Sequence, residues 1–269
     1  MDLKIAAIQL KVTDNKESNL QNARQCVCKA AKKADIIILP EMFNCPYSIE
    51  SFHNFAEEYP GKTTTMLSKT AKKLKKYIIG GSIPEMKDGS IFNTCFAFNR
   101  EGKLIAKHRK IHLFDVDVKD GITFKESDIL SPGDKITIME TEFSKIGVCI
   151  CYDMRFPELI RKMVQKGAKA VIVPAAFNMT TGPAHWHIVT RARALDNQIY
   201  LVAVSPARNL DASYTAYGHS LVVDPWGKVI EEASTDQGII YATIDLDYVD
   251  QIRQQLPLLK HMRTEIYKD

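Results

Sequence analysis

Ala34-Asp-Ile-Ile-Ile-Leu-Pro-Glu-Met-Phe-Asn44 has a counterpart in the second half of the chain, Ala168-Lys-Ala-Val-Ile-Val-Pro-Ala-Ala-Phe-Asn178. Two more pairs follow in the same order: Tyr77-Ile-Ile-Gly-Gly-Ser-Ile-Pro84 with Tyr200-Leu-Val-Ala-Val-Ser-Pro206, and Phe96-Ala-Phe-Asn-Arg-Glu-Gly-Lys-Leu-Ile105 with Leu221-Val-Val-Asp-Pro-Trp-Gly-Lys-Val-Ile230. Ordered self-similarity of this kind indicates a structure built from two repeated halves.

Each half is predicted to contain a helix, an apolar strand, a second helix, another strand and a hairpin that turns at Glu101-Gly102 or Trp226-Gly227. Strands as uniformly apolar as Ile36–Leu39 and Ala170–Val173 must be covered on both faces. Two sheets packed face to face, with helices on their outer sides, satisfy this requirement. The sequence therefore predicts an α/β fold, a four-layer α-β-β-α sandwich.

Composition restricts the possible partners and location. The 269 residues contain no Pro/Gly/Ser-rich linker, so we expect a single domain over residues 1–269. The net charge of +4 is small, and the lysines at 72, 73, 75 and 76 have no aromatic residues among them, which argues against nucleic-acid binding. The N-terminal residues enter a strand directly, and no apolar run is long enough to span a bilayer. We expect a cytoplasmic protein without a membrane partner.

The six cysteines form no Cys-x-x-Cys pair, so neither disulfides nor a structural zinc site is predicted. His185 and His187 flank Trp186 near the start of a predicted helix. Their i, i+2 spacing places them on different helix faces, which argues against a shared metal ion. No metal and no organic cofactor is expected.

Cys151 ends the apolar run Lys145-Ile-Gly-Val-Cys-Ile-Cys151 and precedes Tyr-Asp-Met-Arg-Phe-Pro-Glu158. This pattern predicts a buried strand that stops where a helix begins at Pro157, leaving the thiol on the turn. Unpaired backbone N–H groups there are expected to favour the thiolate and to hold an oxyanion. The alternative is that Cys151 is simply a small buried apolar residue.

Two other strand ends carry chemistry. Ile36–Glu41 is an apolar strand that ends in a carboxylate, and the cations of Lys107–Phe114 follow the strand Gly102–Ala106. A nucleophile, a base and a cation on separate strand ends are expected of a site built on rigid elements. In the repeat, Glu41 corresponds to Ala175, and the counterpart of Lys110 is not basic. One half is therefore expected to keep the scaffold without the chemistry.

Three motifs give the chain a family resemblance: Leu39-Pro-Glu41, Arg109-Lys-Ile-His-Leu-Phe114 and Cys151-Tyr-Asp-Met-Arg-Phe-Pro-Glu158. Their sequence, order and spacing resemble those of the nitrilase or carbon-nitrogen hydrolase superfamily over nearly the whole chain. The resemblance implies the same sandwich fold, with Glu41 as general base, Lys110 as transition-state stabiliser and Cys151 as nucleophile. It also nominates Glu126, ahead of Ser131-Pro-Gly133, as a second carboxylate near the lysine.

This combination suits acyl transfer from a small amide or nitrile. Glu41 would take the thiol proton, and Lys110 with the backbone N–H of Tyr152 would hold the oxyanion before water hydrolyses a thioester. A Cys-His dyad using His108 or His112 is the alternative arrangement. We rank it second because the family uses Glu as base.

The segment Ala176–Trp186 resembles two amidase branches, and Ser205–Arg208 and Ile252–Pro257 resemble the ω-amidases more closely. That likeness implies hydrolysis of small dicarboxylate monoamides, chiefly 2-oxoglutaramate. Arg155, with Thr181 and Tyr47, is the predicted contact for the substrate carboxylate; the alternative for Arg155 is a salt bridge with Glu158 or Asp153.

Other activities stay open. They are a deaminated glutathione amidase, an N-carbamoyl amidase, an amide-transfer subunit with a separate synthetase partner, and an inactive interaction module. Members of the superfamily commonly form homodimers or larger homo-oligomers, which the resemblance also implies here.

Overall fold

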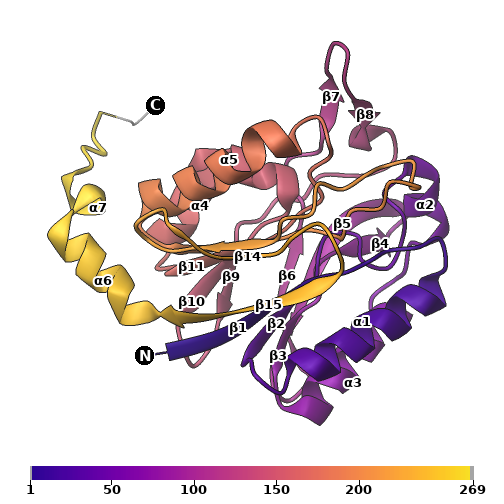
Figure 1. The fold of residues 1–269 in the computed structure, drawn as a ribbon, viewed down its shortest axis with the longest axis horizontal. Coiled ribbons are helices and arrows are strands. Elements are labelled where there is room, and N and C mark those ends of the chain that lie inside the picture. The colour runs from indigo at the N-terminus through magenta and orange to yellow at the C-terminus, as the bar shows by residue number, and fades with distance from the viewer. Residues whose placement is uncertain (1, 267–269) are drawn as a thin grey trace.

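A computed structural model describes residues 2–266, and most of their strands lie in two large sheets (Figure 1). In spatial order the first sheet contains β15 (Gly238–Asp245), β1 (Asp2–Gln9), β2 (Ile36–Ile38), β3 (Tyr77–Ile79) and β5 (Ser90–Phe98), with β4 (Ile83–Lys87) and β6 (Leu104–Arg109) paired to β5. The second contains β9 (Thr137–Glu140), β10 (Lys145–Val148), β11 (Ala170–Pro174), β12 (Tyr200–Val204), β13 (Leu221–Val223) and β14 (Val229–Glu232). A separate hairpin joins β7 (Asp115–Asp117) to β8 (Thr123–Lys125).

The two sheets share one strand plan. β1, β2 and β3 are parallel neighbours, and so are β10, β11 and β12. On one side each trio is followed by an antiparallel hairpin, β5–β6 or β13–β14. On the other side each has one antiparallel strand, β15 beside β1 and β9 beside β10. The sequence repeat thus corresponds to two equivalent sheets, and β4 is an addition to the first.

Side-chain alternation in the central strands divides the interior into layers. Ile36 and Ile38 of β2 pack in one buried cluster with Ile146 of the second sheet, whereas Ile37 between them packs with Leu20 of the first helix. Successive residues of a strand face opposite sides, so β2 is covered by a sheet on one side and a helix on the other. Burying each such side chain stabilises the fold by about 1.5 to 3 kcal/mol.

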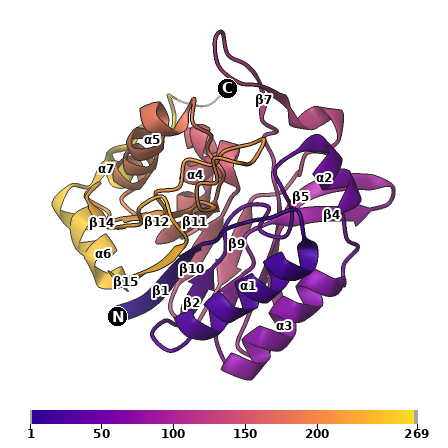
Figure 2. The same ribbon diagram turned by 45° about the vertical axis from the view of Figure 1, so that its right-hand side comes forward.

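Helices cover the outer face of each sheet, α1 and α3 over the first and α4 and α5 over the second (Figures 1 and 2). The helices are α1 (Lys16–Ala30), α2 (Ile49–Asn54), α3 (Lys62–Leu74), α4 (Pro157–Gln165), α5 (Gly182–Asn197), α6 (Leu246–Gln255) and α7 (Leu258–His261), with short 3-10 turns η1 (Glu126–Asp128) and η2 (Cys151–Arg155). In α1 the buried residues Leu20, Ala23, Val27 and Ala30 recur at helical spacing and face β1. The predicted α/β fold is confirmed.

The predicted end of the strand before Cys151 differs from the structure. The strand predicted to reach Cys151 ends at Val148, and the nucleophile turn is a separate 3-10 segment ahead of α4. The chain leaves the ladder because the backbone N–H of Ile150 donates to the Asp153 carboxylate, 3.0 Å away, instead of to a neighbouring strand.

Within residues 2–266 no helix combines the length and apolar character needed to cross a bilayer.

Candidate active site

Glu41 lies just beyond β2 and is completely buried. Its Oε1 accepts a hydrogen bond from Asn93 Nδ2 at 2.7 Å and one from Lys110 Nζ at 3.1 Å. The next residue, Met42, has a φ of +50°, and its backbone N–H donates to Ser82 Oγ at 3.0 Å. The first sheet therefore fixes both the carboxyl and the turn that carries it.

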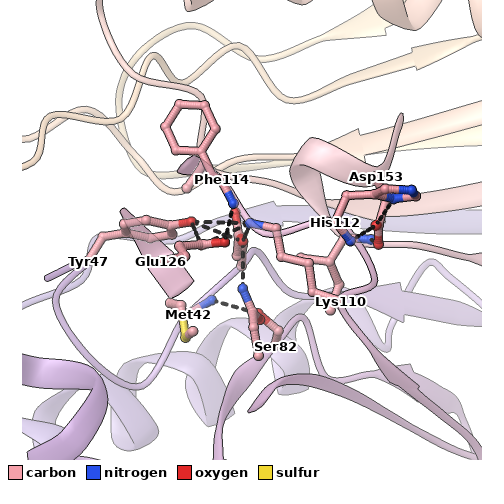
Figure 3. A network of polar contacts seen from close by, with 12 residues as sticks. Met42, Tyr47, Ser82, Lys110, His112, Phe114, Glu126 and Asp153 are labelled. Carbon is pink, nitrogen blue, oxygen red and sulfur yellow. Dashed lines mark hydrogen bonds and ion pairs between the residues drawn. The ribbon is translucent and has the colours of Figure 1, made fainter. Parts of the chain in front are cut away.

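Lys110 directly follows β6 and is also fully buried. Its backbone N–H donates to the Asn93 carbonyl at 2.8 Å, and its Nζ donates to Glu126 Oε1 at 2.9 Å as well as to Glu41 (Figure 3). Burial opposes the charge, but the Glu126 and Glu41 carboxylates outweigh it and hold the Lys110 pKa well above its usual range. Lys110 therefore stays charged between the two carboxylates.

Glu126 is buried in η1, not solvated in a polar loop as its surroundings in the sequence suggest. Its Oε1 lies 2.6 Å from the Tyr47 hydroxyl, and its Oε2 accepts a hydrogen bond from the backbone N–H of Phe114 at 2.8 Å. The Tyr47 hydroxyl is 3.2 Å from Glu41 Oε1. A hydroxyl has one proton, so Tyr47 donates to Glu126 across the shorter contact, and its oxygen also lies beside Glu41.

Cys151 occupies a strained position at the start of η2. Its φ is +46°, a value that few residues other than glycine adopt, and it is 6% exposed. The Glu41 carboxyl, the Lys110 ammonium and the backbone N–H of Ala176 all lie close enough to the Cys151 sulfur to shift its pKa. The other Glu41 oxygen, Oε2, makes no hydrogen bond to the nitrogen or oxygen atoms of the described residues. The structure thus brings the predicted nucleophile, base and cation together.

The expectation that the turn favours thiolate is wrong. Burial, followed by the charge of Glu41, raises the Cys151 pKa well above its usual range, and the opposing effects of Lys110 and the Ala176 N–H are smaller. Burial also raises the Glu41 pKa, although Lys110 works in the opposite direction. The resting site therefore holds a protonated thiol beside a carboxyl group with raised basicity.

Asp153 is a central hydrogen-bond acceptor that sequence reasoning did not select. Its Oδ1 accepts from the backbone N–H of His112 at 2.9 Å and lies 2.8 Å from His112 Nδ1, and its Oδ2 lies 3.0 Å from His108 Nε2 (Figure 3). Despite burial, these contacts hold the Asp153 pKa well below its usual range. Asp153 ties the Lys110 loop to the Cys151 turn. Both histidines bond to it and not to the thiol, which disfavours the Cys-His alternative.

Asn93 is a second residue that sequence reasoning missed. It lies in β5, is fully buried, and supplies one hydrogen bond to the Glu41 side chain and another to the Lys110 backbone. No motif includes it. The available signal is an amide inside the apolar strand Ser90–Phe98, because a buried polar side chain in a strand requires a partner.

Arg155 lines a narrow pocket with Cys151 and Thr181. Its Nη1 is 3.1 Å from His185 Nδ1, its guanidinium carbon lies 4.5 Å from the centre of the Phe177 ring, and its Nε has no hydrogen-bond partner. In the described part of the chain no carboxylate pairs with it, and the alternative partner Asp153 is bonded to histidines. Burial lowers the Arg155 pKa. Arg155 is thus a cation without an anion beside the thiol.

Tyr152 lines the same pocket as Arg155, whereas Tyr47 does not. Tyr47 lies instead on a neighbouring cavity of about 400 Å³ that reaches Glu41. Tyr214 borders both spaces: its ring stacks on Tyr47 with centres 4.5 Å apart, and its hydroxyl donates to the Ala176 carbonyl at 2.5 Å. The predicted substrate contacts are therefore divided, with Arg155 and Thr181 near the sulfur and Tyr47 among the carboxylates.

Comparison with known proteins identifies the family of this chain. A profile described as carbon-nitrogen hydrolase matches residues 4–254. Omega-amidase NIT2 of Mus musculus is 51% identical over 265 residues, which cover 98% of this chain and 96% of that protein. The crystal structure of Saccharomyces cerevisiae Nit3, described as a member of branch 10 of the nitrilase superfamily, superposes with a TM-score of 0.89 at 45% identity over 97% of both chains. The chain is an amidohydrolase, and it belongs to the carbon-nitrogen hydrolase family of the nitrilase superfamily.

Proposed function

We propose that this enzyme is an ω-amidase that uses Cys151 to hydrolyse the terminal amide of small dicarboxylate monoamides, with 2-oxoglutaramate giving 2-oxoglutarate and ammonia. The observation that carries the proposal is the unpaired Arg155 cation in the pocket of a thiol that already has a base. The identity to proteins named omega-amidase supports the same activity.

In the first step Glu41 removes the thiol proton as Cys151 Sγ attacks the amide carbon. The raised pKa values of both groups support this transfer, because a neutral thiol needs a base and a desolvated carboxylate is a stronger one. Glu41 then gives the proton to the departing nitrogen, and ammonia leaves a thioester on Cys151.

Lys110 and backbone N–H groups would stabilise the oxyanion of the tetrahedral intermediate. A lysine ammonium has three donors, and two of those on Lys110 go to Glu41 and Glu126. The third faces the Tyr47 hydroxyl at 3.5 Å, too long for a strong hydrogen bond, and is available to the substrate. The backbone N–H of Tyr152 remains the proposed second donor.

Water completes the cycle. Glu41 takes a proton from water as the oxygen attacks the thioester carbon, and the cleaved sulfur recovers a proton from Glu41. Glu126 and Tyr47 act through Lys110 and Glu41, so we propose positioning roles for them. This reassigns Tyr47 from the substrate carboxylate to the carboxylate cluster.

Arg155 would bind the substrate carboxylate, with Thr181 beside it. A guanidinium that packs over Phe177 and lacks a carboxylate partner can form a two-point contact with that group. The contact would hold the far end of a short substrate and place its amide carbon over Cys151.

Ammonia release from a panel of compounds tests the assignment. We expect 2-oxoglutaramate and succinamate to be turned over well ahead of neutral aliphatic amides, a nitrile and deaminated glutathione. Arg155→Lys should lower kcat/KM for the carboxylate substrates about 10- to 100-fold, since it keeps the charge and loses the fork, and should spare neutral amides. Equal losses on both classes would make Arg155 structural. Fastest turnover of deaminated glutathione or of the nitrile would contradict the ω-amidase assignment.

A further inference from the structure

Three potential metal ligands from distant parts of the chain meet outside the active site. His187 lies in the first half of α5, His219 lies two residues before β13, and Glu232 ends β14. Their side chains are 36%, 25% and 34% exposed, so each is held by neighbours yet reached by solvent. Two imidazoles and one carboxylate are a donor set that binds Zn²⁺ in proteins.

The two histidines converge on a single carboxylate oxygen. His187 Nε2 lies 3.0 Å and His219 Nδ1 lies 2.9 Å from Glu232 Oε1, and the three ligand atoms all lie within 4.8 Å of one another. Zinc bonds of about 2.0 to 2.1 Å in tetrahedral geometry separate ligand atoms by about 3.3 Å. Movements of a few tenths of an ångström at the nearest contacts would therefore let an ion replace the hydrogen bonds.

The backbone already holds His219 in place. Its φ is +57°, its N–H donates to the Ser234 carbonyl at 3.1 Å, and its carbonyl accepts from Trp186 Nε1 at 2.7 Å. Trp186 is fully buried and directly precedes His187, so one anchor connects the two imidazoles. Ligands fixed in this way lose little freedom when a metal binds.

We propose that His187, His219 and Glu232 form a binding site for a divalent transition metal ion of the Zn²⁺ class. Imidazole nitrogen selects such ions over Ca²⁺ and Mg²⁺, which prefer oxygen. The three protein ligands leave a fourth position open to water. The site is separate from the proposed amidase chemistry, which needs no metal.

The sequence pattern points only to the two histidines of one helix, His185 and His187, as possible metal ligands. His185 and His187 do go to different neighbours, Arg155 and Glu232. The missing ligands come from residues that follow β12 and end β14, which the hairpin of the second sheet brings beside α5.

Calorimetric titration with ZnCl₂ at neutral pH tests the site. The Cys151→Ala protein is used so that the active-site thiol cannot bind the ion. We expect one Zn²⁺ per chain, and at least about 10-fold weaker binding in each of His187→Gln, His219→Gln and Glu232→Gln made in that background. His53→Gln, which changes an exposed histidine whose ring contacts Asn54, is the matched control and should bind like its parent.

Two further measurements exclude binding at a cysteine site and loss of binding through unfolding. Co²⁺ bound at this site should show tetrahedral visible bands without a thiolate charge-transfer band, whereas a cysteine site would show that band. Circular dichroism should report folded variants, and Zn²⁺ should raise the melting temperature of the parent and of His53→Gln alone. Absence of binding at 1:1 stoichiometry, or equal binding by the three ligand variants, would overturn the proposal.

Discussion

The ends of corresponding strands in the two sheets carry different chemistry. β2 leads to Glu41 and β11 leads to Ala175, and both positions are fully buried. The registers of β1 with β2 and of β10 with β11 also make Cys151, beyond β10, the counterpart of Leu10, beyond β1. The first sheet thus carries the proposed base and cation, and the second carries the proposed nucleophile. The repeated half thus keeps the strand plan with Ala175 in place of Glu41, and Cys151 lies on the turn that precedes it.

This division shows how a repeated fold can build one site without duplicating it. Beyond β11 the backbone N–H of Ala176 lowers the Cys151 pKa, whereas beyond β2 the Glu41 carboxylate raises it. Buried ionisable groups carry a desolvation cost that opposite charges must offset. In this cluster the Lys110 ammonium, which pairs with both Glu41 and Glu126, offsets that cost. A second such cluster would carry the same desolvation cost without adding a nucleophile.

Among the changes that test this difference between the sheets, removal of the proposed nucleophile is expected to have the largest effect on amide turnover. Cys151→Ala should lower amide turnover by at least about 10⁴-fold with the fold retained, because a methyl group cannot attack a carbonyl. Cys149→Ala, a change in the apolar core two residues away, is the matched control and should keep most activity. Substantial ammonia release by pure, folded Cys151→Ala protein would contradict the assignment of the nucleophile to the second sheet.

Glu41→Gln tests the contribution of the first sheet. Turnover should fall about 10²- to 10⁴-fold, since the amide keeps the shape but cannot accept the thiol proton. The loss should appear in kcat with little change in KM, and steady-state assays across pH measure both. A variant that retains activity would mean that another group, and not Glu41, deprotonates Cys151.

Ala175→Glu makes the end of β11 resemble the end of β2. Ala175 packs in the apolar core, so we expect the new carboxyl to reduce the free energy of unfolding by about 3 to 5 kcal/mol at neutral pH, measured by urea denaturation. Ala175→Gln, of similar size, separates charge from bulk and should cost less. Unchanged stability would show that the second sheet can accommodate an acid as readily as the first.

The smallest expected effect comes from Asn93→Leu, which removes a donor to the Glu41 carboxylate. That hydrogen bond favours the charged form, so its loss should raise the Glu41 pKa further. The base works only when deprotonated, so the acidic limb of the kcat/KM profile should move to higher pH. In the unchanged enzyme the limb should already lie above the usual range for a glutamate, because burial raises its pKa. A shift to lower pH would contradict this account of Asn93.

The sequence is most informative where chemistry coincides with strand ends. Glu41, Lys110 and Cys151 each follow an apolar run, and such runs predict buried strands with little ambiguity. Glu126 was found only through family resemblance, because its local surroundings are those of a surface loop. Its burial depends on Phe114 and Lys110, contacts that no local pattern encodes.

Other features depend on tertiary contacts that spacing does not reveal. Asp153 bonds to residues that lie 41 and 45 positions earlier in the chain, and it also accepts a hydrogen bond from the backbone N–H of Ile150, next to the left-handed Cys151. Proximity to a helix start suggested a thiolate, but burial and the Glu41 charge dominate in the folded protein. The direction of a pKa shift is decided by every group that surrounds the atom.

The pairing of β15 with β1 has a consequence for the nascent chain. β1 is made before β15, yet its outer edge pairs along all eight residues with this strand, which begins at Gly238. At about 5 to 20 residues per second, β15 is synthesised roughly 10 to 50 s after β1, and the outer edge of β1 stays unpaired during that time. An unpaired strand edge is a site of aggregation. Ribosome-bound chains that stop before Gly238 should therefore be the ones that chaperones bind most.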